Sequence, residues 1–288
     1  MYTDMSYWSA SNTGGVHYGY ASTALIDDIA AAQYLYGAKT TTRTGDTVYG
    51  FNSTAGADVY DFTKNTSPIV AIWDSGGFDT IDASGYSVSQ TIDLNDGMFS
   101  SIGGMTYNVS IAFGAQIEGA VGGSGNDTII ANALNDVLKG GLGSDTYVFG
   151  AAWGNDSVQD QGNLNTLKFT AGVTRSSLTF AQSGQDLVIT QSGSSNPITV
   201  VGYFNNTAAF QFMDANGTFV PSIGTGTPPS PPPTNHAPVV SGAATISKTM
   251  SEDGAPIALG IGAPTDADND TDRKSTRLNS SHVALSRM

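Results

Sequence analysis

Gly122-Gly-Ser-Gly-Asn-Asp-Thr-Ile-Ile130 is the most informative stretch of this chain. It recurs in degraded form over residues 131–139 and again as Gly140-Gly-Leu-Gly-Ser-Asp-Thr-Tyr-Val148. Asp127, Asp136 and Asp145 therefore occupy the same position of three successive nonapeptides. This Gly-Gly-x-Gly-x-Asp-x-apolar-x period is typical of a calcium-loaded parallel β-roll. Glycine lets the backbone turn through positive φ and aim carbonyl oxygens inward, and aspartate supplies the charged oxygen ligand that calcium requires.

The same period predicts which residues form the core and which form the edges of the roll. Ile129, Leu138 and Tyr147 follow the turns and should stack inside as the core. Because two nonapeptides make one full turn, loops 122–127 and 140–145 should share an edge and sandwich one ion. Loop 131–136 has lost its glycines, so we expect a weaker ligand set there. The repeats nominate as calcium ligands Gly123, Gly125, Asp127, Asp136, Gly141, Gly143 and Asp145.

The composition limits the classes of protein to which this chain can belong. It holds 35 glycines, 11 basic residues and no cysteine, with a formal net charge of −14. That charge argues against nucleic acid or an anionic membrane as partner and favours a divalent cation. The lack of cysteine fits a secreted bacterial protein stabilised by metal, and equally any reducing compartment. No apolar run is long enough to span a membrane, and the N-terminus lacks the pattern of a signal peptide.

Four stretches, in order along the chain, resemble one protein family. Tyr2-Thr-Asp-Met-Ser-Tyr-Trp-Ser9, followed by a helical pattern over residues 24–37, looks like the Met-turn and next helix of a metzincin catalytic domain. The segments 42–52, 72–82 and 117–127 extend the resemblance, so that residues 1 to about 150 are similar to serralysin. Serralysins are secreted zinc metalloendopeptidases whose catalytic domain is followed by a calcium β-roll.

The helix over residues 24–37 has recognisable ends. Ser22 or Thr23 can cap its N-terminus, and Asp27 and Asp28 suit the positive first turn. Gly37 is placed to end it.

The resemblance also implies roles for particular residues. Met5 would be the methionine beneath the zinc site, and Tyr7 the phenol that steadies the oxyanion in an intact parent protein. Glu118 would add a carboxylate next to the first repeat.

An upstream calcium site is implied by two turns, which contain Arg43, Gly45, Asp46 and Thr47, and Asp74, Gly76, Gly77 and Asp79. Plain polar β-turns are the alternative interpretation of both turns. Phe78, in the second turn, departs from the small polar residue of the family and would be tolerated if it faces solvent.

Zinc catalysis is not expected of the chain as given. The metzincin zinc helix, His-Glu-x-x-His-x-x-Gly-x-x-His, should precede the Met-turn, and only Met1 precedes Tyr2. The three histidines, His17, His236 and His282, are scattered over different segments. We therefore expect Zn²⁺ only in the intact parent.

The organisation changes after residue 150. Residues 151–222 consist of short alternating strands separated by polar turns, and resemble the module that follows the repeats in haemolysin-type calcium-binding exoproteins. This segment should cap the open end of the roll. We interpret its aromatic residues as the core of the cap rather than as a carbohydrate platform; they are Phe180, Tyr203, Phe204, Phe210 and Phe212.

Three further segments complete the chain. Residues 223–236 form a proline-rich linker that should be extended. Residues 237–271 resemble the opening strands of a bacterial cadherin-like or immunoglobulin-like repeat and are too few to close a sandwich. Residues 272–288 are basic, and Asp272 to His282 can be back-translated into a common sequencing-adapter sequence. We interpret this tail as an artefact rather than as an anion-binding arm.

Together these observations predict a mainly β chain. A remnant of an α/β catalytic domain (1–39) with one short helix precedes a calcium-binding parallel β-roll (40–150) and a β-rich cap (151–222). The expected function is that of the calcium-binding end of a secreted serralysin-like zinc metalloendopeptidase, exported by a type I secretion apparatus and acting on extracellular proteins. We expect a monomer that binds several Ca²⁺ ions and no nucleic acid. The alternative is a non-catalytic calcium-dependent adhesin or surface-layer exoprotein.

Overall fold

The computed structural model describes residues 20–160, 162–170 and 172–224. Several expectations fall on residues outside these ranges: the Met-turn with Met5 and Tyr7, most of the proline-rich linker, the cadherin-like repeat and the tail 272–288. Among the described residues, no helix has the length and apolar character needed to cross a membrane.

One α-helix precedes the strands, as the sequence predicts. Helix α1 spans Ile26–Tyr36, with Asp27 and Asp28 in its first turn and Gly37, at φ 80°, after its end. The expected N-cap was wrong, because Leu25 occupies that position and its backbone N–H donates to Asp28 Oδ2 at 3.0 Å. The hydroxyl of Thr23 instead accepts the backbone N–H of Ala71. Thr23 therefore ties the chain before the helix to a strand about fifty residues later.

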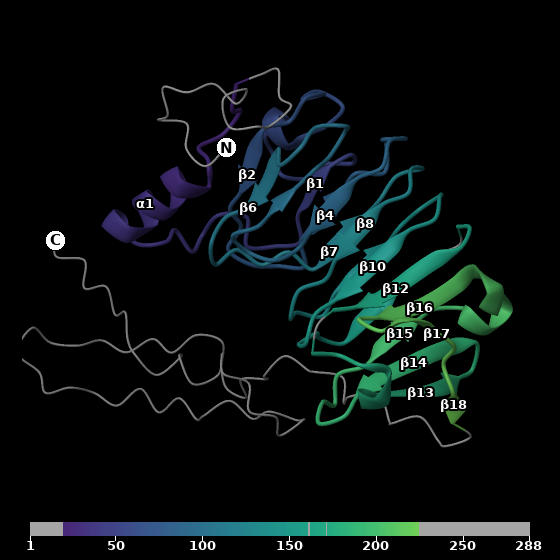
Figure 1. The fold of residues 1–288 in the computed structure, drawn as a ribbon. Helices are drawn as coiled ribbons and strands as arrows, with labels where there is room; N and C mark the ends of the chain where they lie inside the picture. The colour runs from purple at the N-terminus through teal and green to yellow at the C-terminus, as the bar shows by residue number, and fades with distance from the viewer. Residues whose placement is uncertain (1–19, 161, 171, 225–288) are drawn as a thin grey trace, which may run out of the picture. The chain divides into compact units, whose positions relative to one another are not determined.

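The strands form two long sheets and one short sheet (Figure 1). The first long sheet contains, in spatial order, β1 (Val48–Gly50), β3 (Thr80–Asp82), β7 (Gly119–Val121), β9 (Val137–Lys139), β11 (Asp156–Val158), β15 (Ile198–Val200), β14 (Asp186–Gln191), β13 (Leu178–Ser183) and β18 (Ile223–Gly224). The second contains β17 (Gly217–Phe219), β16 (Phe210–Asp214), β12 (Asn165–Phe169), β10 (Thr146–Phe149), β8 (Thr128–Ile130) and β4 (Thr91–Asp93). The short sheet contains β2 (Val70–Ile72), β6 (Val109–Ile111) and β5 (Phe99–Ser100). Four short 3₁₀ segments, η2 (Asp58–Tyr60), η3 (Arg175–Ser177), η4 (Tyr203–Asn205) and η5 (Thr207–Ala209), complete the described elements.

The repeat period produces the roll. Successive strands from β7 to β12 alternate between the two long sheets, and neighbours within a sheet are parallel. Thr128 pairs with Thr146, and Gly119 with Val137, so one full turn uses two nonapeptides. The predicted parallel β-roll is confirmed.

The core lies between the two long sheets. Ile129, Leu138 and Tyr147 are each 0% exposed, which confirms the predicted inward positions. Side chains alternate along a strand, so in β8 and β9 the middle residue alone is buried. The buried cluster runs without interruption from Tyr49 to Phe212.

The segment after residue 150 continues the roll before it changes direction. Strands β11 and β12 pair in parallel with β9 and β10 across the expected domain boundary, which itself stays a prediction. The antiparallel pairs β13–β14, β14–β15 and β16–β17 follow. The aromatic side chains predicted as cap core belong to the buried cluster or pack against it: Phe180, Tyr203, Phe204, Phe210 and Phe212.

Candidate calcium sites at the edges of the roll

Side chains that precede the strands of the second long sheet form a continuous ladder along one edge of the roll. We name Gln90, Asp127, Asp145 and Asn165 the first ladder. The backbone N–H of Gln90 donates to Asp127 Oδ1 at 2.8 Å, that of Asp127 to Asp145 Oδ1 at 2.7 Å, and that of Asp145 to Asn165 Oδ1 at 2.8 Å. Asp127 and Asp145 each accept, through Oδ1, the backbone N–H of the preceding ladder residue. Asp127 Oδ2 also accepts the N–H of Gly123 at 2.7 Å, whereas Asp145 Oδ2 is left for another partner.

A second ladder runs along the first long sheet. It consists of Thr47, Asp79, Glu118, Asp136 and Asp156. The backbone N–H of Thr47 donates to Asp79 Oδ1 at 2.8 Å, that of Asp79 to Glu118 Oε2 at 2.9 Å, and that of Asp136 to Asp156 Oδ1 at 2.9 Å. The structure therefore separates the aspartates of the three nonapeptides, with Asp127 and Asp145 on one ladder and Asp136 on the other.

Several of these carboxylates are buried with an oxygen that has no hydrogen-bond partner. Asp79 Oδ2, Asp136 Oδ1, Asp145 Oδ2 and Asp156 Oδ2 are in this state, in residues that are at most 2% exposed. An unpaired buried carboxylate oxygen is costly, because it loses its hydration without replacement. A cation would remove that cost.

The pKa values of the same groups show how unfavourable their charged forms are. Burial raises the pKa of Asp136 to about 8, with a further contribution from the negative charge of Asp156. Burial also raises the pKa of Asp79, Asp145 and Asp156 to about 7, and nearby carboxylates add to the effect at Asp79 and Asp145. Asp127 is shifted upward for the same reason, although the backbone N–H groups of Gly123 and Gln90 oppose its pKa shift.

The glycines of the repeats let the loops stack with carbonyl oxygens between them. A Cβ at Gly141 would lie 2.2 Å from the carbonyl oxygen of Gly123, and one at Gly143 would lie 2.1 Å from that of Gly125. Both residues have φ above +100°. The backbone N–H of Leu142 donates to the Gly123 carbonyl at 3.0 Å. Loops 122–127 and 140–145 therefore lie on the same edge, as predicted.

Loop 131–136 stacks on the opposite edge. Asn132 donates from Nδ2 to the carbonyls of Leu94 and Ile117, and its backbone N–H donates to Asp136 Oδ2 at 2.9 Å. A Cβ at Gly154 would lie 1.9 Å from the Leu134 carbonyl oxygen. Residues of the neighbouring loops therefore pack around loop 131–136, although this loop has lost the glycines of the repeat.

The two upstream turns are also brought together. The backbone N–H of Phe78 donates to Asp46 Oδ1 at 2.8 Å, and a Cβ at Gly77 would lie 2.5 Å from the carbonyl carbon of Gly45. Asp74 accepts the N–H of Gly76 at 3.0 Å. Phe78 is 39% exposed, which meets the condition for its tolerance. These contacts join turns that are distant in sequence, and the calcium assignment itself stays a prediction.

Arg43, in the first of the two upstream turns, makes its contacts through its side chain. Its Nε donates to the Tyr49 hydroxyl at 2.7 Å, and its guanidinium also donates to the Trp73 carbonyl. The Tyr49 hydroxyl in turn donates to Asp74 Oδ2 at 2.6 Å. The guanidinium lies over the rings of Tyr49 and Tyr60. The side chain of Arg43 therefore braces Asp74.

Sequence reasoning missed the continuation of both ladders. Asp156 and Asn165 are 2% and 0% exposed, and neither was nominated as a site residue. Gly154-Asn-Asp156 has the same three residues as Gly125-Asn-Asp127, and this match could have identified Asp156 as a site residue. It was obscured because Asp136 and Asp156 are 20 residues apart, whereas Asp127 and Asp145 are 18 apart. Asp160 was also missed; it accepts the Tyr147 hydroxyl and the N–H of Gly162.

The donor set fits calcium better than zinc. Among residues 20–160, 162–170 and 172–224, no group of three or more His, Cys, Asp or Glu side chains could hold a metal ion. What the edges offer is single carboxylates next to stacked backbone carbonyls, which are the oxygen ligands that calcium takes. A catalytic zinc requires three protein ligands of the nitrogen, sulfur or carboxylate type.

Comparison with known proteins identifies relatives. Residues 38–216 match the family model described as Peptidase M10 serralysin C terminal. The chain is 57% identical over 145 residues to metalloprotease AprA of Pseudomonas entomophila, a match that covers 48% of this chain and 30% of that protein. It is 58% identical over 128 residues to serralysin B of Dickeya chrysanthemi, covering 44% of this chain and 27% of the relative. It is 54% identical over 139 residues to serralysin of Proteus mirabilis, covering 48% and 28%. The chain thus spans less than a third of the length of these relatives.

Proposed function

We propose, from the premise that this chain belongs to the serralysin C-terminal family of M10 peptidases, that it is a calcium-binding region whose folding is driven by the ion. The parent protein would be a secreted zinc metalloendopeptidase that cleaves extracellular proteins. The residues described here supply no zinc site, so zinc chemistry would belong to another part of that protein.

The observation that carries the proposal is the row of buried carboxylate oxygens without partners on both ladders. In the calcium-free state, each of these side chains must take up a proton or lose hydration. Calcium replaces the missing contacts and lets the carboxylates ionise. Because the unfolded chain has no preformed site, the free energy of binding becomes free energy of folding.

This coupling would suit export. In the low calcium of the cytosol the roll would stay unfolded and pass through a type I secretion apparatus. Extracellular modules bind calcium with Kd values of roughly 10⁻⁴ to 10⁻³ M. Outside the cell the roll would then fold as it bound the ion.

The experiment is a calcium titration of the 288-residue chain, followed by far-ultraviolet circular dichroism. We expect a transition from coil to β structure as calcium rises through roughly 10⁻⁴ to 10⁻³ M. Magnesium should substitute poorly, because it resists dehydration and demands octahedral geometry. A full β spectrum in excess chelator would refute the proposal.

A matched pair of variants ties the transition to the ladders. Asp145→Asn keeps the shape of a first-ladder residue and removes its charge, so it should raise the calcium midpoint by about tenfold. Asp58→Asn removes the same charge from a side chain that is 79% exposed, and should leave the midpoint unchanged. Equal shifts from the two variants would show that general charge, rather than the ladder, controls the response.

A calcium-dependent adhesin remains the second candidate, because residues 237–271 resemble an adhesin repeat. The two functions differ in what the gene encodes ahead of Met1. A zinc helix of the form His-Glu-x-x-His-x-x-Gly-x-x-His there would establish the peptidase. A full-length protein without that motif would favour the adhesin.

A further inference from the structure

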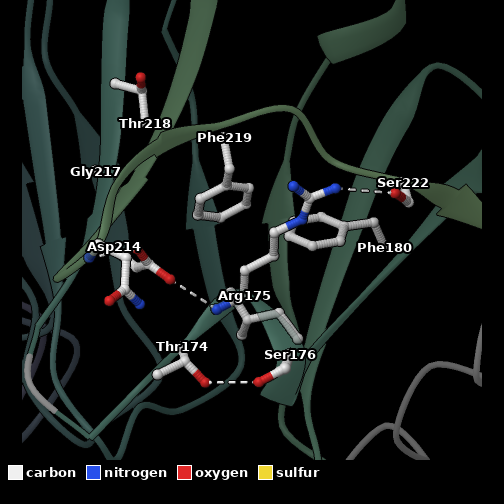
Figure 2. A pocket seen from close by; sticks show the side chains of 11 residues that line it. Thr174, Arg175, Ser176, Phe180, Asp214, Gly217, Thr218, Phe219 and Ser222 are labelled. Atoms are coloured by element: carbon white, nitrogen blue, oxygen red, sulfur yellow. Dashed lines mark hydrogen bonds between the residues drawn. The ribbon is translucent and has the colours of Figure 1, made fainter.

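A pocket of about 590 Å³ lies in the cap, away from both ladders. It is formed where η3 and β13 meet the β16–β17 hairpin and the approach to β18 (Figure 2). We name it the cap pocket, and its principal lining residues are Arg175, Leu178, Phe180, Asp214, Phe219 and Ser222.

The pocket holds one positive and one negative side chain, and the charge of Arg175 is one of the causes that lower the pKa of Asp214. Arg175 and Asp214 form no salt bridge, and Arg175 forms none with any other residue in the described part of the chain. They are joined instead through the backbone, since the N–H of Arg175 donates to Asp214 Oδ2 at 2.9 Å. A hollow with two separate and opposite charges can accept a ligand that carries both.

The Arg175 guanidinium packs against an aromatic side chain that lines the pocket. It lies 5.7 Å from the centroid of the Phe219 ring, and Nη2 donates to Ser222 Oγ at 3.3 Å (Figure 2). Stacking holds the planar group in place, and the hydrogen bond to Ser222 uses only one of its five N–H donors. A carboxylate is the group that such a fork binds in a bidentate manner.

Asp214 is equally held in its charged form. The backbone N–H groups of Arg175 and Asn216 donate to its two oxygens and lower its pKa. Each carboxylate oxygen still has a lone pair to offer an ammonium group. Phe180 is 3% exposed and packs edge-on against Phe219, with ring centroids 6.0 Å apart. The floor of the pocket is therefore apolar.

We propose that the cap pocket binds a short zwitterionic peptide with an apolar side chain, about the size of a dipeptide. The peptide carboxylate pairs with Arg175, its terminal ammonium pairs with Asp214, and its side chain lies against Phe180 and Phe219. This site uses no residue of the calcium ladders, so it stands independently of the proposed function.

The test uses the calcium-loaded 288-residue chain and the dipeptide Ala-Phe with free termini, with binding followed by ligand-observed NMR. Acetylation of the amine and amidation of the carboxylate, in separate probes, should each weaken binding by about tenfold. Inorganic phosphate, which has no apolar part, should bind more weakly than the dipeptide.

Variants then assign the two charges. Arg175→Gln should abolish the difference between the free and amidated carboxylate, and Asp214→Asn the difference between the free and acetylated amine. Lys168→Gln removes an exposed positive charge from β12 outside the pocket and should change neither difference. If a variant fails to fold, the comparison of the three peptides on the unmodified chain still decides the matter. No binding of the free dipeptide, or equal binding of all three peptides, would overturn the proposal.

Discussion

At the scale of single residues, the proposed function implies that the buried aspartates would lower the stability of the calcium-free fold and raise that of the calcium-bound fold. Asp136 and Asp156 are neighbours on the second ladder, and each has one oxygen without a partner. A carboxylate in that state favours its protonated form. The side chains that we propose as calcium ligands would therefore destabilise the calcium-free fold at neutral pH.

This predicts an unusual pH dependence for the calcium-free protein. The folded-state pKa values of Asp136, about 8, and of Asp156, about 7, lie above the unfolded value of about 3.9. The stability contributed by such groups is fully present below the unfolded pKa and is lost as pH rises through the folded pKa. The β structure that the calcium-free protein retains, measured by circular dichroism, should therefore be greater at pH 5 than at pH 8. In saturating calcium, the melting temperature should instead be higher at pH 8.

Asp136→Asn separates the two effects. The amide cannot ionise, so at pH 8 the calcium-free variant should retain more β structure, measured by circular dichroism, than the unmodified protein. In calcium it should show the opposite change, with a raised calcium midpoint. The same direction of change in both conditions would mean that Asp136 does not bind the ion.

At the scale of elements, the loops matter because their backbones touch. Gly141 lies against the Gly123 carbonyl in a conformation with φ +102°. Glycine is therefore required at position 141 for two reasons: the positive φ angle disfavours other residues, and the Gly123 carbonyl leaves no space for a Cβ. Gly184, between β13 and β14, has φ +62° but nothing within 4 Å of its Cβ position.

These two glycines form a matched pair for a test in calcium. Gly141→Ala should destabilise the fold by about 3 kcal/mol or more, because strain and overpacking add. Gly184→Ala should cost only about 1 kcal/mol from the backbone conformation. Chemical denaturation of both variants measures the difference. Equal losses would show that the loops do not stack as closely as described.

At the scale of the whole molecule, the roll and the cap share one core. The buried cluster includes Leu138 of β9 and Leu187 of β14, each 0% exposed. Parallel pairing continues from β9 to β11 and on to β15, which then pairs with β14. Within residues 20–160, 162–170 and 172–224, no break in the core separates the two parts.

We therefore expect one cooperative thermal transition in calcium. Leu138→Ala and Leu187→Ala should each destabilise the fold by about 2–5 kcal/mol and should shift that single transition. Leu142→Ala, at a side chain that is 66% exposed, should change stability by less than about 0.5 kcal/mol. Two separate transitions, one for each leucine, would show that the roll and the cap fold independently.

The whole chain should be inactive as a peptidase. None of its three histidines lies in a zinc-helix motif, so neither the ligands nor the general base is present. Incubation of the 288-residue chain with casein, with zinc and calcium added, should yield no cleavage. Chelator-sensitive hydrolysis would disprove this reasoning.

The amino-acid sequence alone was sufficient to predict the β-roll, its inward residues and the stacking of loops 122–127 and 140–145, because a regular repeat imposes a regular geometry. It was also sufficient for helix α1, whose acidic first turn and terminal glycine are local signals. Only the tertiary structure showed that Asp136 faces Asp156, that Arg43 braces Asp74, and that Arg175 and Asp214, 39 residues apart, share a pocket. These contacts join irregularly spaced segments, and no local pattern records which distant backbone a side chain will meet.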